Sequence, residues 1–161
     1  MFHRRRIDLS NMYGITLVLD DSFKNEEIIK VSDQSMIDDD VNSFHHMFDD
    51  CECLREVEFT DNLDLSKIVD TRCMFANCPN LERVILPPNA FSSIYDCSYM
   101  FQNCPKLSEV IAPRLFVDPC TKRISPNLCK FSKMIDGCQV SPSRLPGSLN
   151  FLVELDKHAN L

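Results

Sequence analysis

The chain has 161 residues, 44% of them apolar, which is enough for one domain with its own core and too few for a second. Lys and Arg total 17 against 24 Asp and Glu, so the formal net charge is -7. Such an acidic surface repels phosphate backbones and anionic lipid, which argues against nucleic acid or a membrane as a partner.

No run approaches the roughly 18 apolar residues that a membrane span needs, and no apolar stretch follows the basic start as in a secretion signal. We therefore expect a cytoplasmic protein. The nine cysteines are an odd number, so they do not all pair within one chain. In a reducing compartment we expect free thiols, most of them packed as small apolar side chains.

Residues 1–40 are predicted to form an N-terminal cap or a degenerate repeat. Ile15, Leu17 and Leu19 alternate with other residues as one face of a strand does. The apolar residues that follow, Phe23, Ile28 and Ile29, are predicted to form a capping turn.

A repeat begins after residue 40, with the pattern Met-Phe-x-x-Cys-x-x-Leu-x-x-Val-x-apolar. Its three clear copies start at Met47, Met74 and Met100. An apolar residue stands six positions before each Met-Phe pair, at Val41, Ile68 and Ile94. Recurrence in register over three copies is far more specific than any single motif.

A fourth, degenerate copy keeps only the upstream half of the pattern, as Leu128, Phe131, Met134-Ile135 and Cys138. Successive Met residues are 27, 26 and 34 residues apart, and Pro113, Pro119 and Pro126 lie in the longer gap. We therefore predict repeats over 41–138 with an irregular insertion near 113–127.

Apolar residues in each unit recur mainly every third position and then alternate in a Val-x-apolar pair. The first spacing fits tight 3-10-like or helical turns, and the alternation fits a short strand with one buried face. One unit cannot bury its own apolar side, so the copies must stack. The predicted fold is a single repeat solenoid, a short arc with a small parallel sheet on one face and short 3-10 or helical turns on the other.

Residues 139–161 are predicted to be a C-terminal cap. Leu145-Pro146-Gly147-Ser148-Leu149 precedes the apolar segment Phe151-Leu152-Val153-Glu154-Leu155. A terminal segment of this kind shields the last repeat from water.

The repeated unit resembles the BspA-like, or Treponema-type, leucine-rich repeat family. The segments that carry the resemblance are Leu81-Glu82-Arg83-Val84-Ile85-Leu86-Pro87 and Phe101-Gln102-Asn103-Cys104-Pro105-Lys106-Leu107. The resemblance covers about residues 41 to 138 and implies a curved solenoid that binds proteins. Many members of the family resemble secreted or surface adhesins, so a second interpretation is a fragment of a surface adhesin.

The chemistry-bearing residues suggest one alternative of another class. His45 and His46 lie close to Cys51 and Cys53, and imidazole and thiolate are good zinc ligands. Cys51, however, is a repeat position that recurs where no histidine occurs. We therefore expect no bound metal, no cofactor and no catalytic residues, with a small zinc- or thiol-dependent protein as the alternative.

The predicted binding surface is the outward face of the sheet. Because side chains alternate along a strand, the neighbours of the inward Leu and Val positions point outward. These residues are Glu56, Glu58, Arg83, Ile85, Glu109 and Ile111. Two isoleucines within a charged rim have the composition of an interface centre. The predicted function is a non-catalytic module that binds a protein partner through this face.

Overall fold

The structure is a computed structural model that describes residues 4–9, 14–19 and 21–159. Its strands are β1 (Arg4–Leu9), β2 (Gly14–Leu19), β3 (Ile28–Val31), β4 (Val41–Ser43), β5 (Glu56–Phe59), β6 (Arg83–Ile85) and β7 (Glu109–Ile111). Three 3-10 helices, η1 (Asp21–Asn25), η2 (Gln34–Met36) and η3 (Pro142–Arg144), and one α-helix, α1 (Gly147–Ala159), complete the described elements. The 3-10 helices lie before β4 and after β7, in the terminal segments of the chain.

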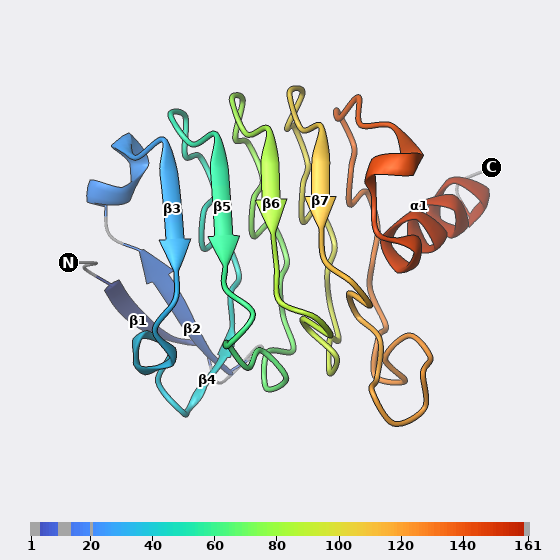
Figure 1. The fold of residues 1–161 in the computed structure, drawn as a ribbon, viewed down its shortest axis with the longest axis horizontal. Coiled ribbons are helices and arrows are strands. Elements are labelled where there is room, and N and C mark those ends of the chain that lie inside the picture. Colours follow the sequence, from blue (N-terminus) through green and yellow to red (C-terminus); the bar gives the residue numbers. More distant parts are fainter. Residues whose placement is uncertain (1–3, 10–13, 20, 160–161) are drawn as a thin grey trace.

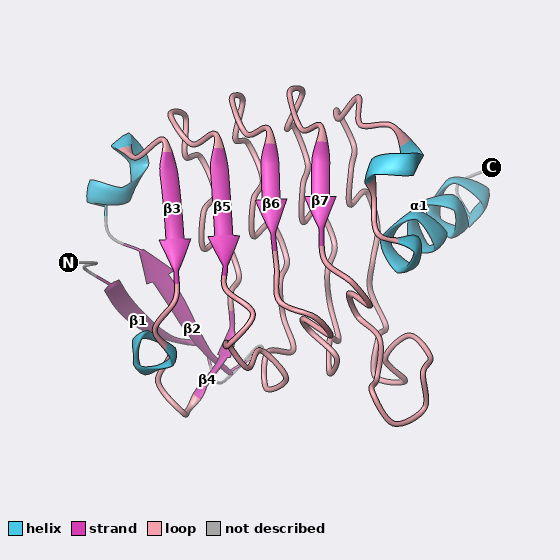
Figure 2. Ribbon diagram, in the orientation of Figure 1, coloured by secondary structure: helices cyan, strands magenta, loops and turns pink. Residues whose placement is uncertain are grey.

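The main sheet has four parallel strands in the order β3-β5-β6-β7 (Figures 1 and 2). Consecutive strands of a repeat protein are neighbours in space, so the chain must return behind the sheet after each strand. The returning segments pair through isolated parallel bridges, Ser43 with Asp70, Asp70 with Asp96, and Asp96 with Lys130. The predicted small parallel sheet is therefore present, and stacked coils connect its strands.

The N-terminal segment adds a second, three-stranded sheet in the order β1-β2-β4. The strand predicted over Ile15 to Leu19 is confirmed as β2, which pairs parallel with β4. The capping turn predicted at Ile28 and Ile29 is wrong, because these residues form β3 and pair with Glu56 and Val57 of β5. Alternating exposure in β3, where Ile29 and Val31 are buried, identifies a strand with one buried face.

Hydrogen bonds between neighbouring coils hold the back of the molecule together. The amide of each repeat phenylalanine donates to the carbonyl of the methionine one coil further on. Phe48 donates to Met74, Phe75 to Met100 and Phe101 to Met134, each at 2.8 Å. Equal distances in three successive pairs show that the Met-Phe positions of the sequence occupy one common place in each coil.

The repeat phenylalanines stack through the core. The ring centroids of Phe48 and Phe75 are 5.3 Å apart with an interplanar angle of 5°, and those of Phe75 and Phe101 are 5.2 Å apart at 1°. All three rings are completely buried. Parallel stacking of this kind requires each coil to repeat the geometry of its neighbour, so the core favours an intact register.

Each coil turns through residues in the left-handed backbone region. The residue before each repeat Met and the residue before each repeat Cys have positive φ values, from 51° at Lys133 to 79° at Gly137. The positions before Cys are Asp50, Asn77, Asn103 and Gly137. Asp, Asn and Gly are the residues that adopt this conformation at least cost, so the sequence already favours these turns.

The two irregular regions also pack onto the coils. The segment predicted as an insertion contains an antiparallel bridge between Val117 and Ile124. Phe116, just before it, is buried and lies 6.4 Å from Phe91 between ring centroids. At the C-terminal end α1 lies beside the last coil (Figure 1) and buries Leu149, Leu152 and Val153.

Replacing Phe75 by Ala is expected to lower the free energy of unfolding by about 3–5 kcal/mol, because the ring leaves a cavity between two stacked partners. Phe151→Ala is the matched control, since 54% of Phe151 is exposed. This control should change stability by less than about 1 kcal/mol. Urea unfolding followed by circular dichroism compares the two variants, and equal losses would contradict the stacked core.

Candidate functional site

The outward face of the main sheet presents two columns of side chains in strict register. Strand pairing aligns Glu56 with Arg83 and Glu109, and it aligns Glu58 with Ile85 and Ile111. On β3, Ile28 extends the first column and Lys30 the second. The structure therefore brings all six predicted surface residues together on three adjacent strands.

Exposure alternates along these strands as the predicted faces require. Val57, Val84 and Val110 are buried, whereas each of the six predicted surface residues is half-buried. That these residues bind a partner remains a prediction.

The charges of this face pair with one another. Arg83 Nε lies 2.8 Å from Glu109 Oε2, and Arg83 Nη1 lies 3.9 Å from Glu56 Oε2. Arg144 continues the row at 3.6 Å from Glu109, and Lys30 lies 3.6 Å from Glu58. Exposed ion pairs add little stability, but they neutralise the face and hold its charged side chains beside the apolar positions.

Ile85 and Ile111 form the apolar part of the face. They are paired residues of β6 and β7, so their side chains stand next to each other. Beyond Ile111 a groove of about 480 Å³ runs between β7 and the segment 143–147, with Ala112, Pro113 and Leu145 in its lining. Neither this groove nor Arg144 follows from the repeat pattern, because both depend on how the C-terminal segment packs against β7.

Ile28 is a second apolar position that the sequence analysis did not assign to the face. It is 64% exposed, the highest exposure among the large apolar residues described. Ile28 pairs with Glu56, 28 residues further along the chain, and this spacing, close to that of the repeats, is the signal that could identify it.

The residues of the alternative zinc site, His45, His46, Cys51 and Cys53, do not come together in the structure. In the described part of the chain, no three His, Cys, Asp or Glu residues are grouped so that they could hold a metal ion. Cys51 is buried in the core, whereas Cys53 is exposed. The histidines have other contacts: His46 Nδ1 lies against Asp49, and His45 Nδ1 lies 3.3 Å from Arg72 Nη2.

The repeat cysteines form hydrogen bonds between coils. The thiol of Cys78 donates to the carbonyl of Phe48 at 3.1 Å, that of Cys104 to Phe75 at 3.0 Å, and that of Cys138 to Phe101 at 2.9 Å. Hydrogen bonds to Cys104 and Cys51, together with burial, raise the pKa of Cys78. A buried thiol held in this way is a packing group and a poor nucleophile.

Stacked coils with one parallel sheet define the chain as a repeat protein with a broad exposed surface. The described residues contain no cluster of metal ligands. The model of the BspA type leucine rich repeat region matches residues 16–122 in six copies. The chain belongs to this family, whose repeats are commonly protein-interaction or adhesin-type modules and are generally non-enzymatic. The match begins within β2, well before the first repeat predicted from residue 41.

Neither the search of curated proteins nor the search of solved structures gives a significant match. Among the described residues, no helix is long and apolar enough to cross a membrane.

His45 should make stability depend on pH. Burial, His46 and Arg72 lower the pKa of His45 from 6.5 to about 4. Between these values the unfolded chain binds more protons, so the stabilisation is present above pH 6.5 and is lost as the pH falls toward 4. We expect urea unfolding to show a loss of about 1–2 kcal/mol over this window, allowing for partial solvent screening. His45→Gln should remove this part of the loss; an identical loss in both proteins would contradict the assignment.

Thiol accessibility should divide the cysteines into two groups. Cys53, Cys120 and Cys129 are exposed, so a thiol reagent such as DTNB should label them quickly in the folded protein. The four buried cysteines should react slowly until denaturant is added, and the half-buried Cys73 and Cys138 should react at intermediate rates. A variant with serine at the three exposed positions should lose the fast phase. A fast phase that persists in this variant would show that a repeat cysteine is accessible.

Proposed function

We propose that the chain is a non-catalytic leucine-rich-repeat solenoid that binds a protein partner through the outward face of its main sheet. The observation that carries this proposal is the pair Ile85 and Ile111, side by side on a face whose charges are already paired. Family membership supports an interaction role, since repeats of this family are commonly interaction or adhesin-type modules.

The pairing of charges favours the isoleucines as the centre of the interface. Removing an isolated charge from water is costly, whereas Arg83 retains Glu56 and Glu109 as neighbours when a partner approaches. An apolar side chain of the partner then removes Ile85 and Ile111 from water. Central apolar contacts within a polar rim are typical of interfaces with a few dominant residues.

The groove beside Ile111 gives the proposed interface a shape. It borders the apolar pair on the C-terminal side and has Arg114 and Arg144 in its lining. A protruding apolar side chain flanked by an acidic residue would fit these features. Nucleic acid is disfavoured as a partner, because the chain carries a net charge of -7.

The remaining parts of the proposal follow from the same features. We infer that residues 1–161 act as one domain, with terminal caps around the repeats, and that the protein works in the cytoplasm with its thiols reduced. Four of the nine cysteines are buried and fill core positions. Packed thiols of this kind need no disulfide.

The double variant Ile85→Asp, Ile111→Asp is expected to abolish capture of the partner while the fold remains, because outward positions contribute little to the core. Central residues of an interface typically contribute 2 kcal/mol or more, which is roughly thirtyfold in affinity each. Pull-down from lysate with mass spectrometry compares the double variant with the wild type.

Ile28→Asp is the matched control, because Ile28 lies on the same face, on β3, and its column is not that of the isoleucine pair. This control should retain the partner. Retention of the same specific partner by the double variant, with unchanged thermal unfolding, would place the binding surface elsewhere.

A further inference from the structure

Every coil directs a row of backbone amides toward the next coil. The amides of Cys73, Phe75 and Asn77 donate to the carbonyls of Ser98, Met100 and Gln102, at 3.1, 2.8 and 2.8 Å. The next coil repeats this arrangement: Tyr99, Phe101 and Asn103 donate to Ser132, Met134 and Asp136, at 2.9, 2.8 and 2.7 Å. Donors therefore recur at every second residue, and each is satisfied by an acceptor at every second residue of the following coil.

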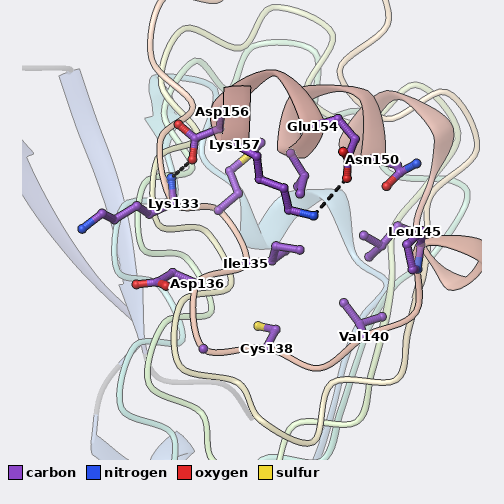
Figure 3. Close-up of a pocket in the computed structure, with 14 residues that line it drawn as sticks. Lys133, Ile135, Asp136, Cys138, Val140, Leu145, Asn150, Glu154, Asp156 and Lys157 are labelled. Atoms are coloured by element: carbon purple, nitrogen blue, oxygen red, sulfur yellow. Dashed lines mark hydrogen bonds and ion pairs between the residues drawn. The ribbon is translucent and has the colours of Figure 1, made fainter. Parts of the chain in front are cut away.

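The last coil has the same donor row, but in the described residues after it η3 and α1 follow instead of another coil. Its equivalent donors are the amides of Lys133, Ile135 and Gly137. Asp156 of α1 accepts from the Lys133 amide with Oδ2 at 2.8 Å (Figure 3), so a side chain replaces one missing carbonyl. Within the described part of the chain, the amides of Ile135 and Gly137 have no hydrogen-bond partner.

A cavity of about 650 Å³ lies where the next coil would continue, between the last coil and α1 (Figure 3). Its apolar lining includes Ile135, Cys138, Val140 and Val153. Ile135 and Cys138 are half-buried, although the equivalent Phe101 and Cys104 of the preceding coil are completely buried. The cavity thus combines backbone donors that have no partner in the described chain with incompletely covered core.

We propose that this cavity binds a peptide segment of a protein partner, which adds to the last coil in the turn conformation that residues 98–103 adopt in the preceding coil. Two carbonyls of the peptide, two residues apart, accept from the amides of Ile135 and Gly137. An apolar side chain of the peptide covers Ile135, Cys138 and Val140. As in strand addition to a sheet edge, main-chain hydrogen bonds would give affinity and the apolar pocket would give specificity, although the donor row here lies on turn residues of the last coil.

The features of the cavity favour a peptide over other occupants. An inorganic anion would satisfy the amides but leave the apolar lining in water, and an apolar small molecule would leave the amides unpaired. A second copy of the chain is disfavoured, because α1 lies beside the last coil where a complete second molecule would have to approach (Figure 1). A single peptide segment supplies backbone carbonyls and an apolar side chain together.

The proposed peptide site is separate from the outward face of the sheet. Its lining comes from the last coil and α1, and neither Ile85 nor Ile111 contributes to it. The two proposals therefore succeed or fail independently.

The chain itself provides the probe. Residues 98–104 carry the carbonyls of Ser98, Met100 and Gln102, which accept from the row equivalent to Lys133, Ile135 and Gly137. A synthetic peptide with this sequence, acetylated, amidated and with Cys104→Ser to prevent oxidation, supplies both the backbone acceptors and the Met-Phe side chains. Fluorescence anisotropy measures binding of the labelled peptide to the full chain, and amide hydrogen exchange by NMR identifies the bonded donors.

The peptide should bind saturably, and the exchange of the Ile135 and Gly137 amides should slow on binding. The Phe101 amide should not change, since it is already bonded to Met134. Val140→Lys, which places a charge in the half-buried lining, should weaken binding at least tenfold. The Ile85→Asp, Ile111→Asp variant is the matched control and should bind the peptide as the wild type does. A peptide with Ser in place of Met100 and Phe101 should bind at least tenfold more weakly.

Three results would overturn the proposal. One is the absence of saturable binding to the wild-type chain. Another is binding that leaves the exchange of both amides unchanged, a readout that needs no variant. The last is self-association of the chain in analytical ultracentrifugation that Val140→Lys abolishes, because the occupant would then be a second copy.

Discussion

The hydrogen bonds between adjacent coils are the constraint on which the rest of the structure depends. Phe48, Phe75 and Phe101 each donate to a methionine carbonyl one coil further on, always at 2.8 Å. This fixed spacing places the phenylalanine rings in parallel stacks and the cysteine thiols on the carbonyls of the preceding coil. Between coils these backbone groups are paired, so the last coil is where donors of the row have no following coil to pair with.

The same register determines what the surface offers. Because β5, β6 and β7 pair without a shift, Arg83 lies between Glu56 and Glu109, and Ile85 lies beside Ile111. The first column pairs its charges internally, and the second ends in an apolar pair next to a groove. A repeat that specifies a core by its inward residues thus leaves the outward residues free to specify a partner.

The two ends of the repeat array are closed by different means. At the N-terminal end β2 pairs with β4, so a second sheet replaces a preceding coil. At the C-terminal end α1 buries Leu149, Leu152 and Val153, and Asp156 satisfies one amide of the last coil. Terminal repeats must shield the core from water; here the C-terminal closure leaves two amides and part of the apolar lining for the proposed peptide.

The sequence by itself determined the repeat register, the parallel sheet and the outward position of Ile85 and Ile111, because the period of the apolar residues directly reflects which side chains face the core. The sequence also carries a signal for the turns, since Asp50, Asn77, Asn103 and Gly137 precede the repeat cysteines at the positive-φ positions. Only the tertiary structure decided that Arg144 pairs with Glu109, and that His45, His46, Cys51 and Cys53 do not converge. These features arise from contacts between segments without a common period, and for such contacts local pattern carries no information about distance.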